Sequence, residues 1–434
     1  MWMLDAPVKE QMVKIASVNG IDVYHIKSRK FKTISTNIFF HDNLSKENAA
    51  KNALLPAVLR RGCVSHPTFQ DIALYLEQLY GAVFDCGVNK KGEHHIAQFY
   101  IEHVNDKYAG QDANLFDKCF ELLCEIITNP VLDNGVFKKE FVDQEKENLK
   151  QLIESRVNDK GQYAVERCFE AMCSDEPFGV YEYGAVEDLN AIDPRSLFEH
   201  YRQFVETLPM MVFITGDVEE SKIQKAVDRL SAMKRGAVKA IALPQTAKQV
   251  KEVKHVTDRM SVNQGKLSLG FRSNTGSDSG DYYPLLVYNT VLGGGVHSKL
   301  FQGVRERESL AYYAFSRLEK YKGLMVISSG IEIANKDRAL DIILKQLEEI
   351  KAGKISEYEF NSSMNTIETG VKSLLDSQLQ IVDFYLGQAL SNGNDTFETL
   401  IEKVRKVTKE DVIRIADKIQ LDTIYFLTAE DGKE

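Results

Sequence analysis

The segment LGGGVHSKLFQGVRERESLAYYAFS, residues 292–316, contains the order of elements on which the fold depends. Its three glycines follow YYPLLVYNTVL, an apolar stretch typical of a helix. Ser298 is a suitable N-cap for a second helix over SKLFQGVRERE, and AYYAFSRLE then alternates as a strand does. Because the strand pattern KLSLGFR comes before this block, the sequence predicts strand, helix, glycine turn, helix and strand.

The first half of the chain repeats this order of elements. Read from about Ile15, the first half has the strand patterns IDVYHIKS (21–28) and TISTNIFF. They lead to an Ala- and Leu-rich helix that begins at Ser45 and ends near LRRG. A second helix opens at Thr68, with Asp71 three residues later as in a capping box, and stops before the strand pattern AVFDCGV. An internal repeat is the signature of a duplicated architecture.

The spacing within the two halves agrees as well as the order. Gly62 and Tyr80 are 18 positions apart, and Gly293 and Tyr312 are 19 positions apart. Both halves also finish with a long helix and an apolar strand, MVFITGDV at 211–218 and TIYFLTAED at 423–431. Locally paired strands with helices in groups predict an α+β fold, each half an antiparallel-rich sheet covered by helices. The predicted parts are an N-terminal extension (1–14), a first domain (15–235), a linker of little periodicity (236–253) and a second domain (254–434).

Composition and charge limit the classes of function. A chain of 434 residues with 44% hydrophobic and 27% charged residues is ordinary for a globular protein. Its net charge of -9 argues against binding to nucleic acid through phosphate neutralisation. We find no apolar run of the roughly 18 residues that a membrane span needs, and no signal-peptide pattern at the start. These features predict a cytoplasmic protein that binds neither nucleic acid nor membrane.

The cysteines and histidines show no local metal-binding pattern. No two histidines stand four residues apart, and the adjacent His94 and His95 should point to opposite faces of a strand. We therefore interpret the histidines as surface or hydrogen-bonded residues. The cysteines are too sparse for a disulfide framework, and we interpret all six as small buried residues: Cys63, Cys86, Cys119, Cys124, Cys168 and Cys173.

The glycine run and the residues after it are the strongest candidates for a binding site. LGGGVHSK does not match a phosphate-binding loop, but three glycines would let another backbone approach closely. Arg305 and Tyr312, which follow it, could hold a peptide carbonyl or a developing oxyanion. The alternatives are a flexible turn between helices and an ordinary charged helix face.

Taken together, residues 292–316 resemble the C-terminal-domain signature of the M16 zinc peptidases, the insulinase-like and mitochondrial-processing-peptidase-like family. The resemblance covers nearly the whole chain and implies two homologous domains of the LuxS/MPP-like metallohydrolase type, arranged as a clam shell. It also implies that Gly293, Gly294 and Gly295 face the substrate, and that Arg305 and Tyr312 hold the scissile carbonyl. Ser309 departs from the glycine that is common at its position.

The zinc motif of that family, HxxEH, is lost in this chain. Aligning NALLPAVLRRG with the family's helix places Ala53 and Ala57 at the two histidines and Pro56 at the catalytic glutamate. Leu152 falls at the distant third ligand, although glutamates lie nearby on the same stretch. Without imidazole ligands and a general base, the chain is not expected to bind zinc or to cleave peptides alone.

The resemblance therefore implies the non-catalytic subunit of a bacterial heterodimeric M16 peptidase. A homologous partner would carry HxxEH and the zinc, and this chain would supply the glycine-rich loop and the Arg/Tyr pair for a peptide substrate. One alternative is a peptide-binding or scaffold protein of M16 fold with no proteolytic role. Another is an independent enzyme with unconventional ligands such as His94, Glu102 or His103.

Overall fold

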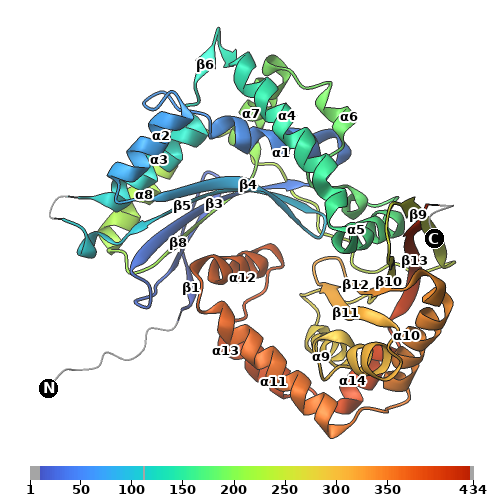
Figure 1. Cartoon of the computed structure of the whole chain (residues 1–434). Coiled ribbons are helices and arrows are strands. Elements are labelled where there is room, and N and C mark those ends of the chain that lie inside the picture. Colours follow the sequence, from blue (N-terminus) through green and yellow to red (C-terminus); the bar gives the residue numbers. More distant parts are fainter. Residues whose placement is uncertain (1–9, 111–112, 431–434) are drawn as a thin grey trace, which may run out of the picture. The chain divides into compact units, whose positions relative to one another are not determined.

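The computed structural model describes residues 10–110 and 113–430 (Figure 1). The chain forms two compact units that are not consecutive in sequence. Unit 1 contains the segments up to Ser155, Val180–Ala242 and Ser377–Leu386, and unit 2 contains Arg156–Gly179, Leu243–Asp376 and the segment from Gly387 onward. Residues 156–179 and 377–386 therefore belong to a different unit from their sequence neighbours. The domain boundaries at 15–235 and 254–434 stay a prediction.

Unit 1 is built on a six-stranded sheet with the order β1-β2-β8-β3-β5-β4. Only β2 and β8 pair in parallel, so the sheet is mostly antiparallel, as expected. The strands are β1 (Met12–Val18), β2 (Ile21–Ile26), β3 (Thr33–Asn43), β4 (Val83–Lys91), β5 (His94–Val104) and β8 (Met210–Thr215), with the small pair β6 (Leu132–Asp133) and β7 (Val136–Phe137) outside the sheet. β1 begins at Met12, inside the predicted extension 1–14, and ends at Val18, beyond it. Residues 1–9 of that extension lie outside the described residues.

Helices cover one face of this sheet (Figure 1). They are α1 (Lys46–Leu59), α2 (Phe69–Gln78), α3 (Leu115–Thr128), α4 (Lys139–Ser155), α6 (Val186–Leu189), α7 (Pro194–Thr207) and α8 (Glu220–Ser231). The predicted capping box at the start of α2 is present, because Thr68 and Asp71 bond each other's backbone N–H. Buried apolar residues from both layers form one core, among them Leu54, Phe99 and Ile214. α12 (Gln378–Leu390) contacts the other side, where Gln378 donates to the Thr33 carbonyl at 2.9 Å.

Unit 2 has a five-stranded sheet with the order β11-β12-β10-β13-β9, in which only β9 and β13 are parallel. Its strands are β9 (Lys254–Met260), β10 (Gly265–Arg272), β11 (Ala311–Glu319), β12 (Leu324–Ile331) and β13 (Gln420–Ala429). Its helices are α5 (Lys160–Met172), α9 (Tyr282–Gly293), α10 (Lys336–Lys351), α11 (Glu357–Leu374), α13 (Phe397–Arg405) and α14 (Lys409–Ala416). α5 packs on the sheet face opposite to α9 and α10 (Figure 1). The order strand, helix, glycine turn, helical segment and strand is therefore present as the sequence predicts.

A buried group of charges fixes the segment after α5 to the sheet of unit 2. Glu176 accepts hydrogen bonds from Arg272 at 2.7 and 3.1 Å and pairs with Lys322 at 2.8 Å. Arg272 also contacts Asp422 at 3.0 Å. Because Arg272 and Lys322 are almost completely buried, each carboxylate neutralises a cation that water does not reach.

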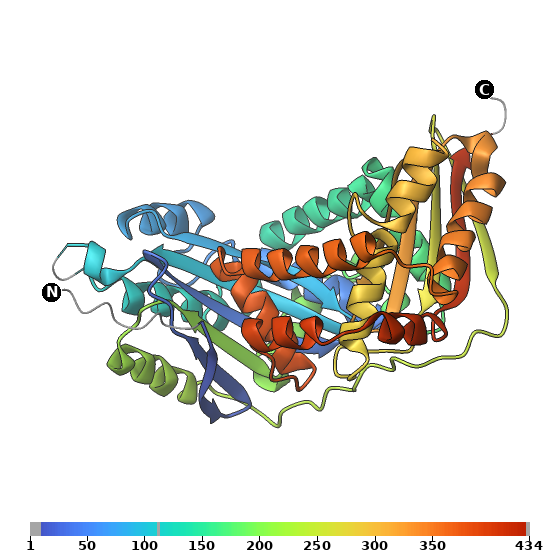
Figure 2. The same ribbon diagram turned by 90° about the horizontal axis from the view of Figure 1, so that it is seen from below.

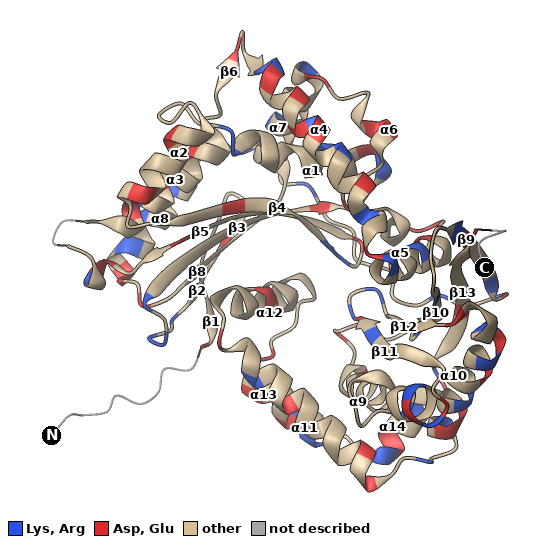
Figure 3. Cartoon of the chain, viewed as in Figure 1, with Lys and Arg blue, Asp and Glu red and all other residues tan. Residues whose placement is uncertain are grey.

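The segment between the two predicted domains, 236–253, contains no helix or strand and runs as an extended coil (Figure 2). Among the described residues, no helix is both long and apolar enough to cross a lipid bilayer. Figure 3 shows acidic and basic residues interspersed along α4, α10 and α11 rather than separated by sign. The surface of these helices therefore carries a mixed charge pattern.

Candidate functional site

The glycine-rich segment begins inside the protein and then emerges. Gly293 is the last residue of α9 and is buried, and a Cβ atom there would lie 2.2 Å from the backbone nitrogen of Ser316 on β11. This glycine therefore lets α9 pack closely against the strand. Gly294 is exposed, Gly295 is half-buried, and Val296 beyond them is exposed. Gly293 is thus a packing residue, and the expectation that the three glycines face a substrate stays a prediction.

Arg305 lies on a π-helical segment, Phe301–Arg307, rather than on a regular α-helix. The hydroxyl of Ser298 accepts a hydrogen bond from the Phe301 N–H at 3.4 Å, near the predicted cap. The Arg305 guanidinium lies 4.7 Å from the centre of the Phe301 ring, and its side chain is 44% exposed. π-helical turns are rare and occur often at functional sites. Stacking on Phe301 orients the cation while leaving its donors accessible to a ligand.

Tyr312 lies at a β-bulge on an edge strand. Ala311 pairs with Ile331 and Tyr313 pairs with Gly330, so Tyr312 is the extra residue between them. β11 has only β12 as a neighbour in the sheet, and the Tyr312 side chain is 54% exposed. Ser309, in the turn between the π-helical segment and β11, has φ +51°. This left-handed conformation is the physical reason why glycine suits that position, as the resemblance implied.

The positions predicted for the lost zinc motif are occupied by apolar side chains. Ala53 belongs to the core of unit 1, Pro56 is buried and Ala57 is half-buried, all on α1. The carbonyl of Pro56 accepts from the Cys86 thiol of β4 at 3.2 Å. These side chains offer neither an imidazole nor a carboxylate to a metal ion.

The position predicted for the third zinc ligand, Leu152, also offers no side chain that binds a metal ion. Leu152 on α4 is 45% exposed. The glutamate that α4 buries is Glu145, and its carboxylate pairs with Arg61 at 3.2 Å and accepts from Asn148 at 3.0 Å. The charge of Glu145 is therefore already neutralised by an arginine.

A buried histidine group next to the lost motif escaped the sequence reasoning. The Asn52 amide on α1 contacts Asp42 at 3.2 Å, His95 at 3.3 Å and His200 at 2.7 Å. On the other side of β5, His94 bonds His41 at 2.8 Å, which confirms that His94 and His95 point in opposite directions. The residues come from segments between positions 41 and 200, so no local spacing could reveal the group.

Burial keeps these histidines neutral. It lowers the pKa of His41 to about 3, helped by the neighbouring His94, and lowers the pKa of His95 and His200 to about 4. Hydrogen bonds from Lys239 and Asn52 outweigh burial at Asp42 and hold the pKa of that carboxyl below its ordinary value. The group is therefore a structural hydrogen-bond network with one carboxylate charge at neutral pH.

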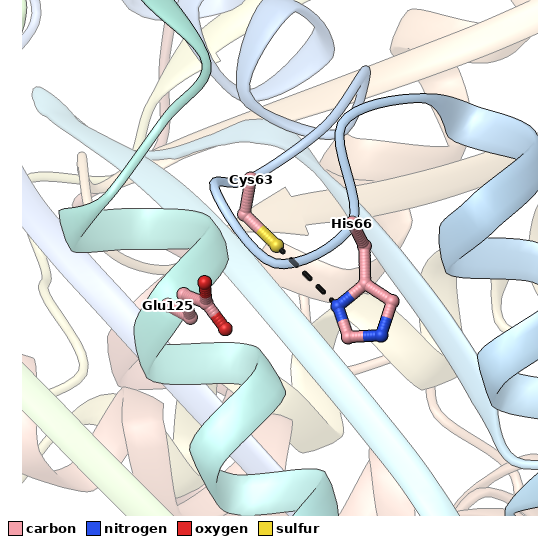
Figure 4. A group of neighbouring side chains, drawn as sticks. All are labelled: Cys63, His66 and Glu125. Carbon is pink, nitrogen blue, oxygen red and sulfur yellow. Dashed lines mark hydrogen bonds between the residues drawn. The ribbon is translucent and has the colours of Figure 1, made fainter.

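The described residues place one thiol, one imidazole and one carboxylate together, from Cys63, His66 and Glu125 (Figure 4). Their ligand atoms lie within 4.8 Å of one another, and such a set can hold Zn²⁺. However, Ser65 already donates its hydroxyl and its N–H to Glu125, at 2.5 and 2.9 Å, and contacts His66 Nδ1 at 2.8 Å. Burial also raises the pKa of the Cys63 thiol, which opposes the thiolate that a metal needs. Hydrogen bonds therefore account for this group without a cation.

The unconventional ligand set is not brought together. His94 lies at the start of β5, and Glu102 and His103 lie near its end, about 26–30 Å away at about 3.3 Å per strand residue. His103 Nδ1 bonds the Val104 carbonyl at 2.8 Å, and Glu102 accepts from the Tyr100 hydroxyl. These three side chains therefore do not form one ligand set, and the alternative of an independent enzyme stays a prediction.

Comparison with known proteins identifies the family. The profile described as the peptidase M16 inactive domain matches residues 191–367. The chain is 35% identical over 413 residues to the probable inactive metalloprotease YmfF of Bacillus subtilis (strain 168), covering 95% of this chain and 97% of that protein. The chain belongs to the M16 peptidase family. The match to the inactive domain and to a probable inactive metalloprotease supports a non-catalytic M16 family member.

Solved structures agree with this assignment. A conserved protein from Enterococcus faecalis V583 superimposes with a TM-score of 0.91 and 29% identity, covering 98% of this chain and 100% of that one. A peptidase M16 inactive domain from Pseudomonas fluorescens gives a TM-score of 0.79 at 18% identity, covering 98% of this chain and 99% of that one. The second likeness shows the M16 fold alone.

Proposed function

We propose that this chain is the non-catalytic subunit of a bacterial heterodimeric M16 zinc peptidase in the cytoplasm. The observation that carries the proposal is an asymmetry within one chain. Arg305 and Tyr312 are exposed on irregular backbone, at a π-helical segment and a β-bulge. Ala53 and Pro56, at the positions assigned to the zinc motif, are buried among apolar residues. Loss of one half of the site with retention of the other half fits a division of labour between two chains.

The homologous partner would carry HxxEH, and its zinc would supply an activated water for attack on a peptide bond. In this chain, the Arg305 guanidinium and the Tyr312 phenol would each donate a hydrogen bond to the carbonyl oxygen of the peptide. That oxygen gains negative charge as the tetrahedral intermediate forms, so the two donors bind the transition state better than the substrate. Gly294, Gly295 and the exposed Val296 would contact the peptide backbone beside them.

The test is reconstitution of peptide cleavage with an HxxEH-bearing M16 partner. We expect Arg305→Ala to lower kcat about 10²–10³-fold while the two chains still associate, because one preorganised donor is lost. Tyr312→Phe should also lower kcat, because it removes the phenol hydroxyl that donates the other hydrogen bond. Arg307→Ala is the matched control, since Arg307 is an exposed cation on the same π-helical segment. Full activity of Arg305→Ala with the partner would contradict the role assigned to this residue.

The alternative is a peptide-binding or scaffold protein without a proteolytic role. It predicts that no HxxEH-bearing partner gains peptidase activity from this chain, and that substitutions at Arg305 and Tyr312 have no effect on any assembly. The same reconstitution therefore separates the two functions. Under both functions, we expect the isolated chain to contain no bound zinc.

A further inference from the structure

A cavity of about 830 Å³ lies within unit 2, between the first turn of α5 and the strands β10, β11 and β12. It is separate from the residues of the lost zinc motif, and neither Arg305 nor Tyr312 lines it. Tyr313 and Phe315 of β11 stack on each other at 5.8 Å and form its aromatic wall. The cavity is therefore large enough for a side chain together with part of a peptide backbone.

Two lysines at this cavity form no ion pair with a carboxylate in the part of the chain that the structure describes. Lys266 of β10 contacts the Gln264 amide oxygen at 3.3 Å and lies 5.5 Å from the centre of the Tyr313 ring. Lys160 at the start of α5 contacts the sulfur of Met260 at 3.9 Å. Within the described residues, neither ammonium group forms an ion pair. Burial lowers the pKa of Lys266 and the nearby Asp159 carboxylate opposes this, so a further anion beside Lys266 would stabilise its charged form.

Neutral donors lie on the same wall. The buried hydroxyls of Ser328 and Tyr313 lie close enough for Ser328 to lower the pKa of Tyr313, but neither has a hydrogen-bond partner of good geometry, and Ser328 is only 1% exposed. Gly161 in the first turn of α5 leaves room for the Tyr313 phenol, which would lie 3.1 Å from a Cβ at that position. The Asp159 carboxylate caps α5 by accepting from the Gln162 N–H at 2.9 Å. A buried hydroxyl without a partner is costly, so a ligand that accepts hydrogen bonds would stabilise this arrangement.

We propose that this cavity binds a carboxylate group of an extended peptide, held by Lys266 and by the Tyr313 and Ser328 hydroxyls. The inference rests on the proposed peptide-binding role of the chain and specifies its substrate class. β11 is an edge strand, so a peptide that pairs with its free edge would run past Tyr313 and Phe315. The carboxylate can come from the C-terminus of the peptide or from an Asp or Glu side chain.

The experiment measures peptide binding to the full-length chain alone, by fluorescence anisotropy. The probe is a short labelled neutral peptide in three forms: a free C-terminal carboxylate, a C-terminal amide, and the amide with one internal Glu. We expect at least one carboxylate form to bind about 10- to 100-fold more tightly than the neutral amide, as charge-assisted hydrogen bonds do. The form that gains affinity identifies the source of the carboxylate.

Variants test the residues. Lys266→Met, which keeps most of the side-chain volume, should remove the preference for the carboxylate, whereas Lys345→Met, at an exposed lysine of α10, should keep it. Tyr313→Phe keeps the stacked ring and should reduce the preference several-fold, even if Lys266→Met fails to fold. Equal binding of all three peptides, no binding of any of them, or an unchanged preference in both Lys266→Met and Tyr313→Phe would overturn the proposal. Because no partner is present, these outcomes are independent of the Arg305 experiment, and either proposal can fail alone.

Discussion

Replacing Glu176 by glutamine tests the buried charges that hold the segment after α5 against the sheet of unit 2. The glutamate side chain is 9% exposed and bonds Arg272 and Lys322, both nearly free of solvent. Burial alone would raise its pKa, but hydrogen bonds from Arg272, Lys248 and Lys322 lower the pKa from 4.5 to about 2. At about 1.36 kcal/mol per pH unit, this fall corresponds to about 3 kcal/mol. Glu176→Gln should therefore reduce the free energy of unfolding by about 3–5 kcal/mol at pH 7, as breaking a buried pair does.

The pH dependence has the sign of a carboxyl with a depressed pKa. Ionised Glu176 stabilises the native state above about pH 4.5, the pKa of the unfolded chain, and this contribution is lost as the pH falls toward 2. Urea unfolding followed by circular dichroism at pH 7 and pH 3 should show the difference between wild type and variant shrinking in acid. Hydrogen exchange should locate the loss of protection in α5, because Arg272 also donates to the Met172 carbonyl at 3.1 Å.

Asp175→Asn is the matched control for this experiment. Asp175 pairs with Lys248 at 2.9 Å, as Glu176 does at 2.8 Å, but the Asp175 side chain is 68% exposed. An exposed pair contributes about 0–1 kcal/mol. If Glu176→Gln cost no more than Asp175→Asn at pH 7, the reasoning from burial would be refuted.

Three further predictions concern local geometry. Ser309→Gly should raise stability by roughly 1 kcal/mol, seen as a higher Tm, because it removes a left-handed serine with φ +51°; a lower Tm would contradict this reading. Gly293→Ala should lower the free energy of unfolding by about 1–3 kcal/mol, since the new Cβ would lie 2.2 Å from the Ser316 nitrogen. An unchanged free energy of unfolding in chemical denaturation would contradict this prediction. The neutral histidines around Asn52, together with His41, should make unit 1 lose stability as the pH falls below about 6.5, because the unfolded chain binds protons that the folded chain refuses. Hydrogen exchange in α1 that is equal at pH 7 and pH 5, after correction for the intrinsic rate, would argue against that linkage.

The features that the sequence predicts are local ones. The apolar run before Gly293 and the alternation after Ser309 define α9 and β11, since each depends on neighbours a few positions away. The capping box at Thr68 is likewise a pattern of four residues. The repeat and the loss of zinc ligands from Ala53 to Ala57 follow from the same kind of information.

The features that the sequence does not reveal depend on contacts between distant segments. Asn52 meets His200 across 148 positions, and Glu125 meets Ser65 across 60. The bulge at Tyr312 depends on register with β12, and the burial of Gly293 depends on Ser316. Periodicity within one element does not specify which distant element it contacts, so these arrangements are determined only in the folded chain.

The chain passes from one unit to the other after Ser155, Gly179, Ala242, Asp376 and Leu386. A protease that cuts once in the coil 236–253 would therefore release no self-sufficient fragment. The N-terminal piece would carry off α5, on which the sheet of unit 2 packs, and the C-terminal piece would carry off residues 377–386 of unit 1. Such pieces should stay associated after cleavage and should recover their structure only when they are renatured together.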